Sequence, residues 1–255
     1  MNIFAHRGLS AYYPENTILA FKKCLDLDIY GIELDVQKTK DGKLVVIHDE
    51  KVDRVYFGHG YVKDFTLEDL ISLKSRKKGF EDRIDCRIPT LEEVLTLFKP
   101  TNFIINIELK NSIIKYKNLE KDVIELVKKL KMERRVILSS FNLRSIKKCN
   151  KINPKIKTSY LVDKIRYNLV LKTKIFSKIK KYNCMAVHPN VKLVDKNFVK
   201  KAHIHDLKVN SYTVDNLYQM KELSKLKVDG IFTNYANIYS AIQEWFITVY
   251  THVLT

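Results

Sequence analysis

The chain has 255 residues, 45% of them hydrophobic, so it can bury one large core or two smaller ones. Its 46 Lys and Arg residues against 29 Asp and Glu residues give a formal net charge of +17, which suggests anionic partners such as phosphate esters, nucleic acid or a membrane surface. The lysines are scattered, with no arginine-rich arm or base-stacking motif. We therefore expect no nucleic-acid partner and interpret most of the charge as solvated helix faces.

The cysteines indicate a reducing compartment. They lie far apart without paired spacing, which is typical of reduced thiols rather than a disulfide framework or a zinc site, at Cys24, Cys86, Cys149 and Cys184. No signal sequence precedes the first strand, and no run of about 18 uncharged apolar residues occurs. These features predict a cytoplasmic protein without a membrane-spanning helix.

Strand-like runs alternate with amphipathic runs along the whole chain. We expect strands at residues 2–5, 31–36, 103–109, 136–140, 157–162, 184–188, 208–213 and 230–233. We expect helices at residues 15–29, 91–98, 117–131, 143–150, 165–181, 195–206, 215–226 and 236–250. Eight strands that are each followed by a helix predict an α/β fold, the parallel (β/α)8 TIM barrel. No repeat or low-complexity linker breaks the pattern, so we predict a single domain over residues 1–255.

The second strand is expected to continue into a hairpin. Asp41-Gly42 is typical of a two-residue hairpin turn, with a short strand at 44–47 after it. This turn would set Asp35 opposite His48. The following segment, about 50–88, is too long for a plain connection, and we interpret it as a small insertion over the C-terminal mouth of the barrel. It ends at Pro89, and Thr90 is the expected cap of the next helix.

Three acidic residues fall at the C-terminal ends of adjacent predicted strands. Glu33 and Asp35 share one face of the second strand, and Glu108 ends the third. In a TIM barrel these strand ends line the active-site mouth. Three carboxylates at one depth would repel each other without a cation, and ligation by oxygen alone favours Ca²⁺, Mg²⁺ or Mn²⁺. We predict that Glu33, Asp35 and Glu108 bind one divalent cation.

Two histidines flank the predicted cation site. His6 ends the first strand and His48 follows the hairpin, and near neutral pH an imidazole can donate or accept a proton. Arg7 and Lys110 lie beside them and could neutralise a phosphate. Cleavage of a dialkyl phosphate requires both a proton donor and charge neutralisation. This set of side chains therefore predicts a phosphodiester hydrolase with His6 and His48 as catalytic residues.

His188 is a further candidate at the mouth. It precedes Pro189 at the end of the sixth predicted strand. A contact with substrate and a purely structural packing role are equally compatible with this position, and we retain it as a candidate substrate-binding residue.

An ordered set of motifs resembles the glycerophosphodiester phosphodiesterase family, within the phospholipase C-like phosphodiesterase superfamily. The resemblance runs from His6 to about Asn234. It rests on His6-Arg7-Gly8, Pro14-Glu15-Asn16-Thr17, Glu33-Leu34-Asp35-Val36, Thr39-Lys40-Asp41-Gly42, His48-Asp49, Ile88-Pro89-Thr90-Leu91-Glu92-Glu93-Val94, Glu108-Leu109-Lys110, Ser139-Ser140-Phe141 and Asp229-Gly230-Ile231.

The resemblance implies a substrate and a role for each matching residue. It implies hydrolysis of a glycerophosphodiester to sn-glycerol 3-phosphate and an alcohol such as choline or ethanolamine. The family matches imply Ca²⁺ or Mg²⁺ at the three acids, an acid–base pair at the two histidines, and phosphate contacts for Arg7 and Lys110. The resemblance adds Glu15 and Asn16 as residues that orient those groups, although a cap at the start of the first helix explains them equally well.

The chain departs from the family pattern on the glycerol side. Tyr212 stands where the family usually has Trp, and we expect it to line the pocket together with Phe141. A smaller ring with a hydroxyl could shift the substrate preference. No departure removes a predicted metal ligand or catalytic histidine.

Two other functions remain open from the sequence. A phospholipase D-like enzyme would use the same histidines on a lysophospholipid and release a cyclic phosphate. A non-catalytic binder of anionic ligands or membranes would need only the basic surface, and would not need an acid–base pair.

The end of the chain is a candidate membrane contact. Its apolar stretch around Trp245-Phe246-Ile247 is compatible with the last barrel helix packing on the sheet. It is also compatible with peripheral docking of this C-terminal helix on a membrane or on a second subunit.

Overall fold

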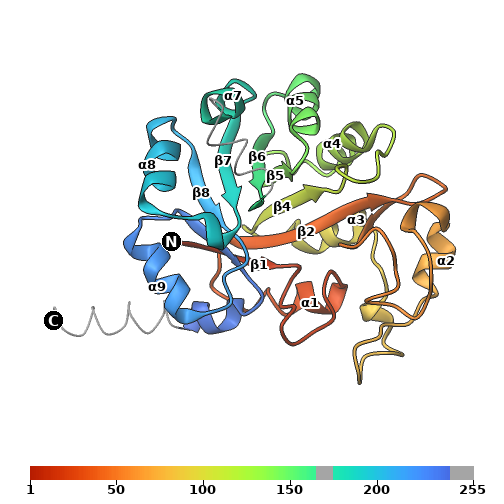
Figure 1. Ribbon diagram of the computed structural model, residues 1–255. Helices are drawn as coiled ribbons and strands as arrows, with labels where there is room; N and C mark the ends of the chain where they lie inside the picture. The colour runs from red at the N-terminus through yellow and green to blue at the C-terminus, as the bar shows by residue number, and fades with distance from the viewer. Residues whose placement is uncertain (165–174, 242–255) are drawn as a thin grey trace.

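A closed parallel barrel forms the body of the protein (Figure 1). A computed structural model describes residues 1–164 and 175–241. The barrel strands pair with their neighbours in chain order, and β9 pairs with β1 to close the sheet. They are β1 (Asn2–His6), β2 (Gly31–Lys38), β4 (Ile104–Leu109), β5 (Val136–Ser140), β6 (Lys157–Val162), β7 (Cys184–Pro189), β8 (Lys208–Ser211) and β9 (Gly230–Thr233). The predicted TIM barrel is confirmed.

Helices cover the outside of the barrel (Figure 1). They are α1 (Ile18–Lys22), α3 (Leu91–Phe98), α4 (Leu119–Lys129), α5 (Leu143–Ile152), α7 (Ile175–Lys181), α8 (Lys196–Ile204) and α9 (Leu217–Lys225). Their buried faces pack with the outward strand residues into one large apolar cluster. A smaller cluster of Phe4, Ile137 and Phe232 lies among inward-facing strand residues. The strands are thus buried on both faces.

The helix boundaries follow local capping chemistry. Thr90 and Glu93 form the reciprocal capping box that starts α3, as the sequence predicts. The first helix is shorter than the predicted range 15–29, because Thr17 is its N-cap and the regular helix ends at Lys22. The predicted helices at 165–181 and 236–250 are described only over 175–181 and 236–241. The proposed membrane contact around Trp245 lies outside the described residues.

The hairpin register is one residue away from the prediction. β3 (Leu44–Val46) pairs antiparallel with β2, and Val36 lies opposite Val46. Beyond this pair the Ile47 N–H donates to the Asp35 carbonyl at 3.0 Å. The residue beside Asp35 is therefore Ile47, and the prediction that Asp35 lies opposite His48 is wrong.

The turn chemistry explains this shift. Thr39 and Lys43 close the loop, since the Thr39 N–H donates to the Lys43 carbonyl at 3.0 Å. Three residues lie between them, and the last, Gly42, has a φ of +79°. A three-residue loop that ends in a left-handed glycine is a common hairpin connection. It moves the pairing by one residue relative to a two-residue Asp-Gly turn.

The insertion packs beside the end of β2. It contains the 3-10 turns η1 (Val62–Asp64) and η2 (Ile84–Cys86) and the short helix α2 (Leu67–Ile71). Its apolar residues form a cluster of their own with the β3 segment. Figure 1 shows it as a separate lobe next to the barrel. A further 3-10 turn, η3 (Val191–Leu193), follows β7.

Within the described residues, no helix is long and apolar enough to cross a membrane. That the chain forms a single domain stays a prediction, and the continuous nine-stranded sheet, with β3 as its antiparallel edge, supports it.

Candidate functional site

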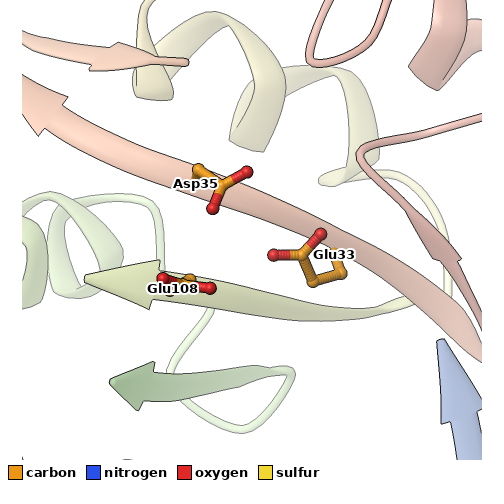
Figure 2. Close-up of side chains that lie close together, drawn as sticks. All are labelled: Glu33, Asp35 and Glu108. Atoms are coloured by element: carbon orange, nitrogen blue, oxygen red, sulfur yellow. The ribbon is translucent and has the colours of Figure 1, made fainter. Parts of the chain in front are cut away.

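Three buried carboxylates meet at the C-terminal end of the barrel (Figure 2). Glu33 and Asp35 come from β2 and Glu108 from β4, and the parallel register sets Asp35 beside Glu108. One oxygen of each lies within 4.8 Å of the others. Their exposures are 5%, 0% and 8% respectively. The strand geometry thus brings together the three residues predicted as metal ligands.

The electrostatics of this cluster favour a bound cation. Burial raises the pKa of Glu33 well above its ordinary value, and the neighbouring charges of Asp35 and Glu108 add to the shift. Burial also raises the pKa of Glu108, and Asp35 contributes although Lys110 opposes it. Asp35 Oδ1 is buried and has no hydrogen-bond partner among the described residues. An all-oxygen set with excess negative charge and one oxygen without a hydrogen bond fits a hard divalent ion.

Two basic side chains border the acids. Arg7 has a left-handed backbone, its N–H donates to Glu33 Oε2 at 3.1 Å, and its Nε lies 3.5 Å from Asp35 Oδ2. Lys110 Nζ lies 3.3 Å from Glu108 Oε1 and 4.0 Å from Asp35 Oδ1. Burial opposes ionisation of Asp35, but His48, Arg7 and Lys110 outweigh it and hold the pKa of Asp35 below its ordinary value. Asp35 is therefore the ionised anchor of the cluster.

His6 is oriented from the far end of the chain. Its Nδ1 lies 2.8 Å from Asn234 Oδ1, and Asn234 Nδ2 donates to Asp215 at 2.5 Å. A carboxylate only accepts hydrogen bonds, so the amide nitrogen of Asn234 must face Asp215 and its oxygen must face His6. His6 therefore carries its proton on Nδ1. Its Nε2 is left unprotonated, 3.9 Å from Glu33 Oε2. Burial and the charge of Arg7 lower the pKa of His6 to about 4.

His48 is oriented by its neighbour in sequence. Its Nδ1 lies 2.6 Å from Asp49 Oδ1, and Arg54 Nε donates to Asp49 Oδ2 at 2.6 Å. Burial opposes ionisation of Asp49, but the hydrogen bonds from His48 and Arg54 lower its pKa well below the ordinary value. The Asp49 carboxylate accepts the Nδ1 proton of His48. Nε2 is thus the ring atom left to exchange a proton in the cavity.

Glu15 and Asn16 contact the charged residues of the site. Asn16 Nδ2 donates to Asp35 Oδ2 at 2.9 Å. Glu15 accepts from Arg7 at 2.9 Å and from Arg54 at 2.7 Å. Both residues precede Thr17, which is the N-cap of α1, so neither is itself the cap. That Glu15 and Asn16 orient the site stays a prediction.

A cavity of about 160 Å³ lies at this site, and Asp35 and Lys110 are not among the residues that line it. Both histidines, Arg7, Glu33 and Glu108 line it, together with Phe141 and Tyr212 on the aromatic side. The rings of Phe141 and Tyr212 meet edge to face at 6.1 Å. The Tyr212 hydroxyl donates to the Val162 carbonyl at 3.1 Å. The structure thus brings the two predicted aromatic residues to the same cavity as the histidines.

His188 lies elsewhere. It is fully buried on β7, its ring is 4.9 Å from that of Phe232, and Asn210 Nδ2 lies 3.2 Å from its Nε2. Burial lowers its pKa to about 3. The structure does not bring His188 to the wall of this cavity, and its surroundings match the packing interpretation.

Several residues of the site were not predicted. Asn234 and Asp215 orient His6, Asp49 and Arg54 orient His48, and Gln37 contacts the backbone around His48. Asn234 directly follows the last strand and Asp49 directly follows His48. The sequence pattern therefore places both residues at the mouth of the barrel. The partners of Gln37 depend on the hairpin register, which the sequence pattern placed one residue away.

Comparisons with known proteins agree on one family. The model of the glycerophosphoryl diester phosphodiesterase family matches residues 6–238. A glycerophosphodiester phosphodiesterase of Caldanaerobacter subterraneus subsp. tengcongensis is 41% identical over 91% of this chain and 93% of its own length. The Bacillus altitudinis protein of the same name is 40% identical over 95% of this chain and 98% of its own length.

Solved structures share the fold. A phosphodiesterase of Oleispira antarctica, in complex with the product sn-glycerol-3-phosphate, has a TM-score of 0.80 and 25% identity, covering 95% of this chain and 97% of that one. An Agrobacterium tumefaciens structure described as a putative glycerophosphoryl diester phosphodiesterase has a TM-score of 0.88 at 19% identity. The match covers 97% of this chain and 99% of that one. The second likeness concerns the fold alone.

The burial of His188 predicts a pH dependence of stability. The folded chain holds this ring neutral down to about pH 3, whereas the unfolded chain protonates it near pH 6.5. The unfolded state therefore binds more protons between these values, and the free energy of unfolding falls as the pH drops below 6.5. Replacement His188→Gln should remove this contribution, which is at most about 1.4 kcal/mol per pH unit. Denaturant unfolding of both proteins from pH 4 to 7 measures it, and parallel profiles would contradict a buried neutral His188.

Proposed function

The chain belongs to the glycerophosphoryl diester phosphodiesterase family, and we propose that it hydrolyses glycerophosphodiesters to sn-glycerol 3-phosphate and an alcohol, using one divalent cation and two histidines. The observation that carries the proposal is one cavity lined by His6, His48, Glu33 and Glu108, with a ligand oxygen of the buried Asp35 within 4.8 Å of those of the two glutamates. The product named for the Oleispira antarctica structure supports a glycerophosphodiester as the substrate class.

The acid cluster suits Ca²⁺ or Mg²⁺, with Mn²⁺ as a further candidate. Glu33, Asp35 and Glu108 would hold the ion through carboxylate oxygens. When bound, the ion supplies positive charge that neutralises the phosphate oxygens of the diester. Arg7 and Lys110 lie at the same acids, and we infer that they bind the phosphate and orient it.

The two hydrogen-bond networks support different proton roles for the histidines. His6 presents an unprotonated Nε2, because Asn234 fixes its proton on Nδ1, so His6 is the base of the first step. His48 donates Nδ1–H to Asp49, and a carboxylate at that position suits the charged imidazolium that an acid requires. His48 is then the acid that protonates the departing alcohol.

The attacking group is the glycerol 2-hydroxyl of the substrate. Intramolecular attack of this kind is favoured over a bimolecular one by about 7–11 kcal/mol. His6 removes the hydroxyl proton, the oxygen bonds to phosphorus, and the bond from phosphorus to the alcohol oxygen breaks as His48 protonates it. A cyclic 1,2-phosphate results. Water then opens the ring, with His48 taking the water proton and His6 returning its proton to the 2-oxygen.

Phe141 and Tyr212 define the glycerol side of the cavity. Their edge-to-face rings offer an apolar wall for the glycerol carbons. The Tyr212 hydroxyl already donates to the Val162 carbonyl, so the ring rather than the hydroxyl is the surface that meets the substrate.

The cation site predicts a separation of activity from stability. Replacement Glu33→Gln removes one ligand charge but keeps an oxygen that can accept the Arg7 N–H. Turnover dependent on Mg²⁺ or Ca²⁺ should be abolished, while the unfolding midpoint in chelator should equal or exceed that of the wild type because repulsion is relieved. Replacement Asp35→Asn should also abolish turnover but lower the midpoint, because Arg7 and Lys110 lose a charged partner. If the Glu33→Gln protein turned over substrate in chelator at the wild-type rate, the proposed cation site would be refuted.

The histidine roles predict a difference between leaving groups. Replacements His6→Ala and His48→Ala should each lower kcat on glycerophosphocholine by about 10²–10⁴-fold. A nitrophenyl diester releases a stable phenolate that needs no proton. His48→Ala should therefore recover single-turnover nitrophenol release, and His6→Ala should not. Recovery by His6→Ala instead would reverse the assignment, and equal losses on both substrates in both variants would refute it.

The cyclic route predicts dependence on the 2-hydroxyl. An analogue of glycerophosphocholine that lacks this hydroxyl should bind but turn over more slowly than the parent by several orders of magnitude, because the intramolecular nucleophile is gone. Choline release from both compounds measures the ratio. Equal rates would mean that water attacks the diester directly.

A further inference from the structure

The segment that carries His48 lies outside the regular sheet. The β2–β3 ladder ends at the pair of Val36 and Val46, followed by one bond from the Ile47 N–H to the Asp35 carbonyl. Residues 48–50 are bends without strand pairing. The carbonyl groups of residues 47–49 therefore need another donor to fix the backbone around His48.

Gln37 supplies that donor. It is fully buried near the end of β2, on the same face of the strand as Glu33 and Asp35. Its Nε2 lies 3.0 Å from the Ile47 carbonyl oxygen, 3.1 Å from that of His48 and 2.7 Å from that of Asp49. One amide group thus contacts three consecutive carbonyls centred on His48.

Tyr116 fixes the orientation of this amide. Its hydroxyl donates to Gln37 Oε1 at 2.8 Å, and the residue, in the segment between β4 and α4, is 8% exposed. Carbonyls only accept hydrogen bonds, so Nε2 must face them and Oε1 must face Tyr116. The backbone of Tyr116 is itself held, because its N–H donates to Asn111 Oδ1 at 2.8 Å. The contacts connect the β4 side of the mouth to the His48 segment.

We propose that Gln37, held by Tyr116, is a positioning residue that sets the location of His48 for proton transfer to the leaving group. The proposal rests on the proposed function, in which His48 is the acid. The Gln37 amide binds the backbone on both sides of the His48 side chain, so it fixes the origin of the imidazole, while Asp49 fixes the rotation of the ring. A displacement of about 1 Å in such a group can cost about 10²-fold in rate.

The test uses Gln37→Leu, which keeps the apolar part of the side chain and removes the amide. Single-turnover release of choline from glycerophosphocholine should fall by about 10–100-fold. Release of nitrophenol from the nitrophenyl diester should stay near the wild-type rate, because this step needs no acid. KM should change little for either substrate. A merely structural role would lower both rates together or change neither.

Two matched variants complete the experiment. Tyr116→Phe keeps the ring in the core but removes the hydroxyl that orients Gln37, and it should show a smaller loss with the same dependence on leaving group. Ser240→Ala removes another buried hydroxyl, which donates to the Asp28 carbonyl ahead of β2 and away from the cavity, and it should leave both rates at the wild-type level.

The outcomes separate the proposal from the function it rests on. Equal losses on both substrates, or no loss on either, in a folded Gln37→Leu protein overturn the proposal. If that variant does not fold, Tyr116→Phe decides by the same criterion. A His48→Ala reference measured alongside shows whether His48 is the acid. If the loss depends on the leaving group in His48→Ala but not in the Gln37 and Tyr116 variants, the positioning role alone is refuted. If the loss does not depend on the leaving group in His48→Ala, the acid role of His48 and the positioning proposal are refuted together.

Discussion

Three like charges buried at one end of a barrel are the constraint that organises this protein. Two unit charges about 4 Å apart repel by about 4 kcal/mol at an effective dielectric constant of 20. One oxygen of each of Glu33, Asp35 and Glu108 lies within 4.8 Å of the others, and Arg7 and Lys110 offset two of the three charges. A divalent cation would turn the remaining single negative charge into a single positive one. The same cluster would then attract the phosphate of a substrate.

The fold brings the two histidines to this cluster by different means. Closure of the barrel between β9 and β1 places Asn234 beside His6, so the tautomer of the first histidine depends on residues more than 200 positions away. His48 is oriented locally, by Asp49 and by the Gln37 amide. This difference in orientation supports the proposal that the two histidines carry out opposite proton transfers.

The sequence predicted the features that depend on periodicity and strand order. The strands at 136–140, 157–162 and 230–233 and the helix at 91–98 have the predicted bounds, and the acids meet because parallel strands end at one mouth. The predictions fell short where contacts between distant parts of the chain determine the structure. The three-residue turn at Gly42 shifted the hairpin. For His188 the sequence left substrate contact and packing open, because its burial depends on its partners Asn210 and Phe232 from other strands. The orienting role of Asn234 depends on barrel closure, which no local pattern reports.

The central claim is that the three carboxylates form a divalent cation site, and direct binding tests it without any assay of turnover. Calorimetric titration of the metal-free chain with Mg²⁺ or Ca²⁺ should show one ion bound per chain. The unfolding free energy should rise with the ion by mass action, by about 2.7 kcal/mol at 100 times Kd. Absence of binding heat and an unchanged unfolding midpoint for Mg²⁺, Ca²⁺ and Mn²⁺ would contradict the account.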